Sequence, residues 1–215
     1  MLPLVTPSKV VCVGLNYKAH AEELGYPLPN MPSFFLKPPS SIIGNGEPIV
    51  LPSGMGRIEH EAELAMVVGK VCRNLTPEEA EESLFGFTCA NDVTAREVQK
   101  VDPLIGHCKS YDTFCPIGPW IETELEDIND LSIRCLVNGE VRQSANTGDM
   151  IFRPLDLLCF LSRVMTLMPG DVILTGTPPG ISPIQADDVV QVSIEGIGTL
   201  SNPVEGPGPE EKILQ

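Results

Sequence analysis

The sequence lacks the features that would place it at a membrane or on nucleic acid. No apolar run approaches the roughly 20 residues that a membrane-spanning helix needs. Basic residues are scarce, because 14 Lys and Arg stand against 29 Asp and Glu, a formal net charge of −15 at pH 7. No concentrated basic patch offsets this charge, so phosphate backbones are poor partners for this chain. We expect neither a membrane nor a nucleic acid among its partners.

The seven cysteines form no C-x-x-C pair, so the usual spacing of a zinc or redox motif is missing. Most of them lie in apolar stretches such as "VVCVG" and "LLCFL". This is typical of small buried side chains in a reducing compartment. The opening residues, "MLPLVTPSKVVCVG", show no basic segment followed by a small-residue cleavage site. We therefore expect a cytoplasmic protein.

Proline and glycine are abundant, at 21 and 19 residues, and are spread along the whole chain. They divide it into many short elements, which favours a strand-rich α+β fold with long loops. The chain shows no internal repeat and no interdomain linker. Its 215 residues are enough to bury a sizeable core. We expect one domain over 1–215, with a short lead-in at 1–9 and a loose tail at 205–215.

Apolar runs and turn signals place the individual elements. Strands are predicted at 9–15, 34–37, 57–70, 84–92, 131–137, 140–143, 171–178, 188–196 and 198–204. Helices are predicted at 16–25, 76–83, 93–100 and 154–167. Thr76 and Glu79 have the spacing of a capping box, and Asn138-Gly139 is a type I′ hairpin signal.

Acidic residues alternate in the segment "IEHEAEL", where Glu59, Glu61 and Glu63 would share one face of a strand. Alternate positions are roughly 6.6 Å apart on a strand, so neighbouring carboxylates can reach one cation. Asp92 closes the next predicted strand. Carboxylates without Cys or His suit Mg²⁺, Mn²⁺ or Ca²⁺ and disfavour zinc. Spacing alone leaves open that the alternating glutamates form a solvated strand face.

His20 and Glu23 are three residues apart in a predicted helix, so they are neighbours on one helical face. A carboxylate bonded to an imidazole fixes its tautomer and raises its basicity, and the pair can then take a proton from water. A surface ion pair has the same spacing, and the sequence does not distinguish the two. The adjacent Glu22 is not part of this pair.

Four segments in order give a resemblance to a known family: "IEHEAELAMVVGK", "GFTCANDVTAREVQ", "CKSYDTFCPIGPW" and "LMPGDVILTGTP". Together they resemble the successive signatures of the fumarylacetoacetate hydrolase family, and the likeness extends from about Val10 to Val204. The resemblance implies the family's fold, a β-rich mixed roll around a central cleft, and its habit of forming homodimers. It points to the compact branch of acylpyruvate hydrolases, oxaloacetate decarboxylases or tautomerases, and hydroxyheptadienedioate isomerases.

The resemblance also implies roles for single residues. The metal ligands would be Glu61, Glu63 and Asp92, with Glu59 a bystander and His60 on the opposite strand face. The catalytic residues would be His20, Glu23 and Lys109, the substrate contacts Gln99 and Thr177, and Thr113 a partner beside the metal ligands. Asn16 and Lys37 are weaker candidates for substrate contact. The sequence departs from the family pattern at Ile105, His107 and Cys108, which concerns the choice of substrate more than the chemistry.

The implied activity is a Mg²⁺-dependent hydrolase that cleaves C–C bonds in 2,4-dioxo acids and releases pyruvate. Mn²⁺ or Ca²⁺ could replace Mg²⁺. An isomerase, tautomerase or decarboxylase acting on 2-oxo diacids is the alternative, because the same site can supply the same enolate. A non-catalytic module that binds a metal and a 2-oxo acid is a second alternative.

Overall fold

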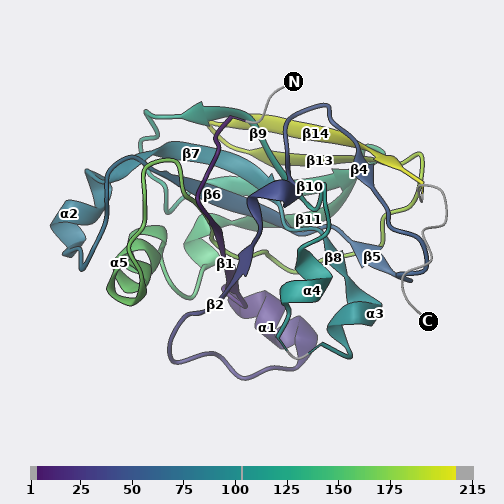
Figure 1. The fold of residues 1–215 in the computed structure, drawn as a ribbon, viewed down its shortest axis with the longest axis horizontal. Coiled ribbons are helices and arrows are strands. Elements are labelled where there is room, and N and C mark those ends of the chain that lie inside the picture. The colour runs from purple at the N-terminus through teal and green to yellow at the C-terminus, as the bar shows by residue number, and fades with distance from the viewer. Residues whose placement is uncertain (1–3, 103, 207–215) are drawn as a thin grey trace.

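The computed structural model describes residues 4–102 and 104–206, and its body consists of two sheets with short helices at either end (Figure 1). The seven-stranded sheet contains, in spatial order, β2 (Ser33–Lys37), β1 (Val10–Gly14), β12 (Val172–Leu174), β6 (Ala62–Val68), β7 (Leu84–Asn91), β9 (Cys115–Glu122) and β3 (Ile42–Ile43). The five-stranded sheet contains β11 (Glu140–Asn146), β10 (Ser132–Val137), β13 (Val189–Ile194), β14 (Gly198–Glu205) and β4 (Ile49–Val50). A separate ladder joins β5 (Ile58–Glu59) to β8 (Thr94–Ala95).

The helices are short and lie in two groups. The α-helices are α1 (Lys18–Leu24), α2 (Pro77–Glu81), α3 (Arg96–Gln99), α4 (Gly106–Lys109) and α5 (Pro154–Val164), and the 3₁₀ turns are Pro39–Ser41 and Thr147–Asp149. Helices α2 and α5 pack together at one end, while α1, α3 and α4 gather on the other side of the sheets (Figure 1). No helix among the described residues is long and apolar enough to cross a bilayer. The predicted β-rich α+β fold is confirmed.

The main core lies between the two sheets. Leu64 and Met66 of β6 meet Ile133 of β10 and Val192 of β13 in one buried cluster. The other face of the large sheet carries a smaller buried cluster, which contains Val10, Cys12, Ala65, Ala90, Cys115, Ile117, Val172 and Leu174. All seven cysteines are buried and free, as expected for small apolar side chains. Burial on both faces explains why β6 is apolar from Leu64 to Val68.

The helix-cap and turn signals predicted from the sequence are confirmed. The side chain of Thr76 accepts a hydrogen bond from the Glu79 amide while Glu79 bonds back to Thr76, which is the capping box that starts α2. Asn138 and Gly139 both have positive φ, as a type I′ turn requires. Gly25 ends α1 in the left-handed conformation.

Several boundaries differ from the predictions. Residues 94–95, predicted to be helical, form β8, and the strand predicted at 171–178 is shorter, as β12 covers only Val172–Leu174. The strand predicted at 57–70 is broken at residues 60–61, because β5 pairs with β8 whereas β6 pairs with β7. Glu205, expected to open a loose tail, is the last residue of β14 and pairs with Val50. The rest of that tail, 207–215, lies outside the described residues, as do residues 1–3 of the lead-in.

Asp171 fastens the start of β1 to the start of β12. Its Oδ1 accepts hydrogen bonds from the Ser8 amide (2.9 Å) and hydroxyl (2.7 Å), and its Oδ2 accepts one from the Met168 amide (2.8 Å) and pairs with the Lys9 ammonium. Burial by itself raises the pKa of Asp171. The hydrogen bonds from Lys9, Met168 and Ser8 lower this pKa by more than burial raises it, so the net shift is downward. The charged form is therefore the one that stabilises the fold.

We expect Asp171→Asn to destabilise the protein at pH 7 by roughly 1–3 kcal/mol, as for other buried acceptors that lose a charge-assisted partner. A carboxylate with a lowered pKa stabilises the fold above its unfolded-state pKa, and this contribution is lost as pH falls through the folded-state value. The difference between the two proteins in urea unfolding should therefore shrink below about pH 4. A difference that stays constant down to pH 2 would contradict this assignment.

Candidate active site

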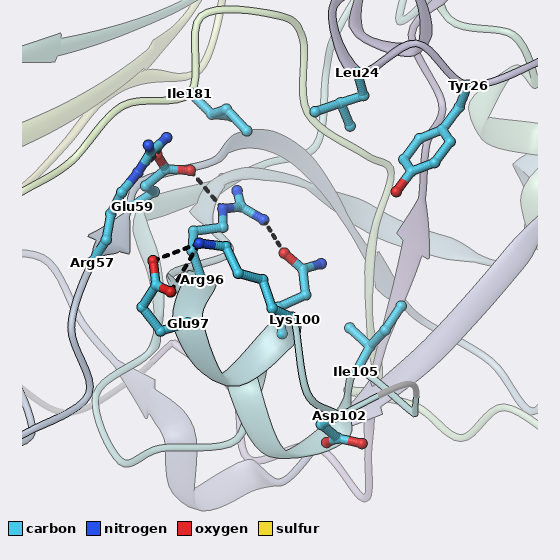
Figure 2. Close-up of a pocket in the computed structure, with 11 residues that line it drawn as sticks. Leu24, Tyr26, Arg57, Glu59, Arg96, Glu97, Lys100, Asp102, Ile105 and Ile181 are labelled. Atoms are coloured by element: carbon cyan, nitrogen blue, oxygen red, sulfur yellow. Dashed lines mark hydrogen bonds and ion pairs between the residues drawn. The ribbon is translucent and has the colours of Figure 1, made fainter.

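The three alternating glutamates do not share one environment. Glu59, on β5, is fully buried between the guanidinium groups of Arg57 and Arg96 (Figure 2). Glu59 lines a different cavity from Glu61 and Glu63, although the guanidinium of Arg96 binds both Glu59 and Glu61. His60 points away from the cavity of Glu61 and Glu63, as predicted, and contacts Gln143 (3.1 Å) and Ser182 (2.8 Å).

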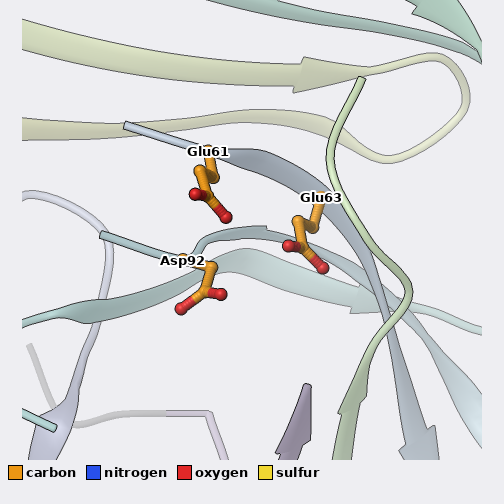
Figure 3. A group of neighbouring side chains, drawn as sticks. All are labelled: Glu61, Glu63 and Asp92. Carbon is orange, nitrogen blue, oxygen red and sulfur yellow. The ribbon is translucent and has the colours of Figure 1, made fainter. Parts of the chain in front are cut away.

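Glu61, Glu63 and Asp92 converge, and we call them the acidic triad (Figure 3). Each offers one carboxylate oxygen that lies within 4.8 Å of the others, and all three residues are buried. The strand register explains this, because Ala62 of β6 pairs with Asn91 of β7 and so sets Asp92 beside Glu61. The Asp92 amide donates to the Glu61 carbonyl at 2.8 Å. The predicted ligands thus come from the ends of two neighbouring strands.

Buried cations compensate two of the three carboxylates. The Lys109 ammonium donates to Glu61 Oε2 (2.8 Å) and Asp92 Oδ2 (2.6 Å). Lys37, fully buried on β2, binds the other oxygen of Asp92, and Arg96 binds the other oxygen of Glu61. Burial alone would raise the pKa of Glu61, but Lys109 and Arg96 hold that pKa well below its usual range. Glu61 is therefore ionised and ready to act as a ligand.

Glu63 is the triad member left without a cation. Among the described residues no Lys or Arg nitrogen lies within ion-pair distance of it, and its Oε2 accepts only the Gly176 amide, at 2.5 Å. Burial and the negative charges of Asp92 and Glu61 raise the pKa of Glu63 well above its usual value. A hard divalent cation bound to three such oxygens would neutralise this excess of negative charge. The residues present fit Mg²⁺, Mn²⁺ or Ca²⁺.

The contact with Glu63 requires glycine at position 176. Gly176 has φ +100°, and a Cβ there would lie 2.6 Å from the Cβ of Asn16. Asn16 in turn holds the same loop by donating to the Thr175 carbonyl at 2.7 Å. Asn16 is thus a support of the loop, and its predicted contact with substrate has no counterpart in this geometry.

His20 and Glu23 form the predicted pair. His20 Nδ1 lies 2.8 Å from Glu23 Oε2, and the Gly180 amide donates to Glu23 Oε1 at 3.0 Å. Helix α1 is thereby tied to the loop that follows β12. His20 is buried, at 6% exposure, whereas the neighbouring Glu22 is exposed.

A cavity of about 310 Å³ is lined by His20 of this pair and by the acidic triad. Its lining includes His20, Glu61, Glu63, Asp92, Gln99, Lys109 and Thr177. The structure therefore brings together the predicted ligands, the predicted base, and the predicted lysine and substrate contacts. Lys109 also lies over the ring of Phe35, 5.3 Å from its centroid.

Thr177 is at the cavity wall, but its hydroxyl already has partners. Oγ1 donates to the Ala62 carbonyl (2.9 Å) and accepts from Gln143 Nε2 (2.8 Å). Gln143, buried on β11, also binds the Pro178 carbonyl and the Ala62 amide. It fixes the loop after β12 against β6, a role that no sequence signal indicates, since the segment "EVRQS" reads as an ordinary strand.

The structure does not bring Thr113 to the acidic triad. Its Oγ1 accepts from the Val50 amide at 2.9 Å and so anchors β4. Thr94 is the threonine that contacts the triad, with Oγ1 3.1 Å from Glu61 Oε1 and 2.9 Å from the Asp92 carbonyl. Thr113 thus supports β4 in this structure, and Thr94 is the threonine that lies beside the acidic triad.

Arg96 is a site residue that the sequence analysis missed. Besides Glu59 and Glu61 it binds Gln99, donating from Nη1 to Oε1 at 2.8 Å. It therefore orients a predicted substrate contact and a predicted metal ligand together. The one available signal was its position four residues after Asp92, one turn along in a segment predicted to be helical.

The fold and the site define a β-rich protein with a buried carboxylate cluster suited to a hard cation. Residues 9–205 match the family model described as the C-terminal region of fumarylacetoacetate (FAA) hydrolase. The chain belongs to the fumarylacetoacetate hydrolase family.

Solved structures and curated relatives share this architecture. 2-Hydroxyhepta-2,4-diene-1,7-dioate isomerase from Mycobacterium marinum is 45% identical with a TM-score of 0.90, over 97% of this chain and 78% of that one. Maleylpyruvate hydrolase from Sphingobium sp. SYK-6, in complex with manganese(II) and pyruvate, is 37% identical with a TM-score of 0.83, over 94% and 72%. The mitochondrial oxaloacetate tautomerase of Homo sapiens is 42% identical over 95% of this chain and 68% of its own length.

These relatives are isomerases, hydrolases and tautomerases. The chain is therefore an enzyme rather than a non-catalytic binding module.

We expect one divalent cation to bind per chain and Glu63→Gln to weaken binding at least about tenfold, since even outer partners of a metal site contribute this much. Titration calorimetry with Mn²⁺ after chelator treatment measures the affinity. Glu82→Gln is the matched control, because Glu82 is 80% exposed and pairs only loosely with Lys70. An unchanged Mn²⁺ affinity in Glu63→Gln would show that the ion binds elsewhere.

Proposed function

We propose that this enzyme is a Mg²⁺-dependent hydrolase that cleaves the C–C bond of 2,4-dioxo acids of the acylpyruvate type and releases pyruvate. The observation that carries the proposal is the His20–Glu23 pair, whose histidine lines the same cavity as the acidic triad. Isomerisation needs no activated water, whereas hydrolysis does. A histidine with a fixed tautomer at the wall of the site therefore favours hydrolysis.

The acidic triad would hold the ion through Glu61, Glu63 and Asp92. Mg²⁺ bound there supplies a Lewis acid that polarises the 2-oxo group. The similarity to a maleylpyruvate hydrolase solved with manganese(II) and pyruvate supports both the metal and the product.

His20 acts as the base. Glu23 accepts the Nδ1–H of His20, so the lone pair of Nε2 is free to take a proton from water. The hydroxide oxygen adds to the C4 carbonyl carbon, and the C3–C4 bond then breaks with its electron pair going to C3. The acyl part leaves as a carboxylic acid, and C3 takes up a proton to give pyruvate.

Lys109 stabilises the charge that develops on the pyruvate part. Its ammonium is held by Glu61 and Asp92, and these two carboxylates raise its pKa despite a burial that would lower it. Lys109 is therefore a cation in the metal-free site, where it would act as an electrostatic stabiliser.

Removal of the imidazole tests the assignment of the base. We expect His20→Ala to lower pyruvate release from acetylpyruvate by roughly 10²–10⁴-fold, the usual contribution of a general base. Coupled oxidation of NADH by lactate dehydrogenase follows the pyruvate. Glu23→Gln should cost less than His20→Ala, and Glu22→Gln, its exposed neighbour, should have no effect. If pyruvate release is unchanged in His20→Ala, His20 does not activate water.

Removal of the metal tests the other half of the proposal. Exchange into EDTA should abolish pyruvate release, and added Mg²⁺ should restore it, because the acidic triad alone repels an anionic substrate. Full activity in the metal-free protein would refute the metal's role.

A second candidate is tautomerisation or decarboxylation of a 2-oxo diacid such as oxaloacetate, favoured by the 42% identity to a human oxaloacetate tautomerase. Both reactions pass through the same enolate and need no activated water. Enolisation of oxaloacetate that survives in His20→Ala, without hydrolysis of acetylpyruvate, would favour this candidate.

We further propose a single catalytic domain over 1–215 that acts as a homodimer in the cytoplasm, as the family resemblance implies. Light scattering coupled to gel filtration measures the mass in solution. A mass near that of one chain would contradict the dimer.

A further inference from the structure

Glu59 is a buried carboxylate that the proposed mechanism does not use. It is fully buried on β5, and both of its oxygens have a partner. Oε1 pairs with Arg57, and Oε2 accepts the Nε–H of Arg96 at 2.5 Å (Figure 2). A buried ion pair is a weak source of stability, because the cost of desolvating two charges offsets their attraction. What the pair orients is therefore more informative than what it stabilises.

Backbone pairing brings Glu59 and Arg96 together. Glu59 pairs with Thr94 in the short ladder of β5 and β8, and α3 begins at Arg96, two residues further along the chain. The Arg96 amide donates to the Arg57 carbonyl at 2.8 Å, which extends the ladder by one contact. The backbone thus sets the relative positions of the two side chains, in addition to the attraction between their charges.

Each nitrogen of the Arg96 guanidinium has a different acceptor. Nε donates to Glu59 Oε2 and Nη2 donates to Glu61 Oε1. Nη1 donates to Gln99 Oε1 at 2.8 Å. Because the guanidinium is planar and rigid, three acceptors on three nitrogens fix its orientation.

Two residues of the site depend on this orientation. The Glu61 carboxylate is held at Oε1 by Arg96 and by the Thr94 hydroxyl. Gln99 is oriented too, because Arg96 can only donate and so requires the amide oxygen of Gln99 to face it. The NH₂ group of Gln99 then remains as a donor for a substrate anion. One guanidinium therefore orients a predicted metal ligand and a predicted substrate contact.

Removal of the Glu59 carboxylate would leave Nε of Arg96 without its acceptor. The guanidinium could then turn and bind Glu61 through two nitrogens, which is the geometry that arginine favours with a single carboxylate. Both oxygens of Glu61 would be engaged by Arg96 in that arrangement. Glu61 would then be a poorer ligand for a cation.

We propose that Glu59 is a positioning residue, which sets the orientation of Arg96 and, through it, that of Glu61. In this role Glu59 contacts neither the ion nor the substrate and acts only through Arg96. The family resemblance implied a bystander at this position. The inference rests on the ion site of the proposed function, and it is independent of whether the reaction is a hydrolysis, an isomerisation or a decarboxylation.

A double-mutant cycle on Mn²⁺ affinity tests this proposal. Calorimetry after chelator treatment should show that Glu59→Gln weakens Mn²⁺ binding at least about tenfold, the usual cost of removing an outer partner of a metal site. In the Arg96→Met background the same substitution should change the affinity by less than about twofold, because the guanidinium to be oriented is gone. Urea unfolding checks that each variant is folded.

Glu97→Gln is the matched control. Glu97 is the neighbour of Arg96 on α3, and its partly exposed carboxylate pairs with Lys100. Its removal takes away a negative charge from the same helix without changing the partners of Arg96. The Mn²⁺ affinity of Glu97→Gln should equal that of the wild-type protein.

The cycle separates orientation from the electric field of the Glu59 charge. If Glu59 attracted the ion directly, Glu59→Gln would weaken binding by the same factor in both backgrounds, and that result would overturn the proposal. Glu59→Asp is a second variant, which keeps the charge and is shorter by one methylene. It should also weaken Mn²⁺ binding, and only where Arg96 is present. Should Glu59→Gln fail to fold, the cycle with Glu59→Asp decides by the same criterion.

This proposal and the proposed function fail in different ways. A wild-type protein that binds no Mn²⁺ would overturn both the ion site and the role of Glu59. Tight Mn²⁺ binding that is insensitive to the Glu59 substitutions would overturn the role of Glu59 alone. The expected cycle in a protein that releases no pyruvate from acetylpyruvate would support the role of Glu59 and leave only the hydrolase assignment in error.

Discussion

The rest of the site depends on the burial of three carboxylates within 4.8 Å of one another. Such a cluster is costly in a low-dielectric interior unless cations neutralise it. Lys37, Lys109 and Arg96 pair with the carboxylates of Asp92 and Glu61, while no Lys or Arg in the described part of the chain pairs with Glu63. The acidic triad can therefore accept one more positive charge.

The loop after β12 connects this electrostatic centre to the proposed base. Its glycine amides bind Glu63 at one point and Glu23 at another, so a single loop fixes a metal ligand and the partner of His20. Gln143 holds the same loop from the smaller sheet. Movement of the loop would therefore disturb the proposed ion site and the proposed base together.

Much of this arrangement could be predicted from the sequence. Local turn chemistry placed the Thr76 cap and the Asn138-Gly139 turn, and the family resemblance placed the acidic triad. The rest depends on contacts between distant segments. The break after Glu59 comes from a change of strand partner, and the contact of Thr94 with Glu61 depends on the path of the chain after Asp92. Neither leaves a periodic signal in the residues themselves, so spacing alone could not separate Glu59 from the acidic triad and could not find Thr94.

Proteins of this family catalyse several reactions on one scaffold. In this chain, the elements around the proposed ion site distinguish it from a simple metal site. The most direct test of the account is an anomalous difference map from crystals soaked in Mn²⁺. We predict a single strong peak bonded to one oxygen each of Glu61, Glu63 and Asp92, at about 2.0–2.2 Å. A map with no peak between these residues, or with their carboxylates turned apart, would contradict the central claim.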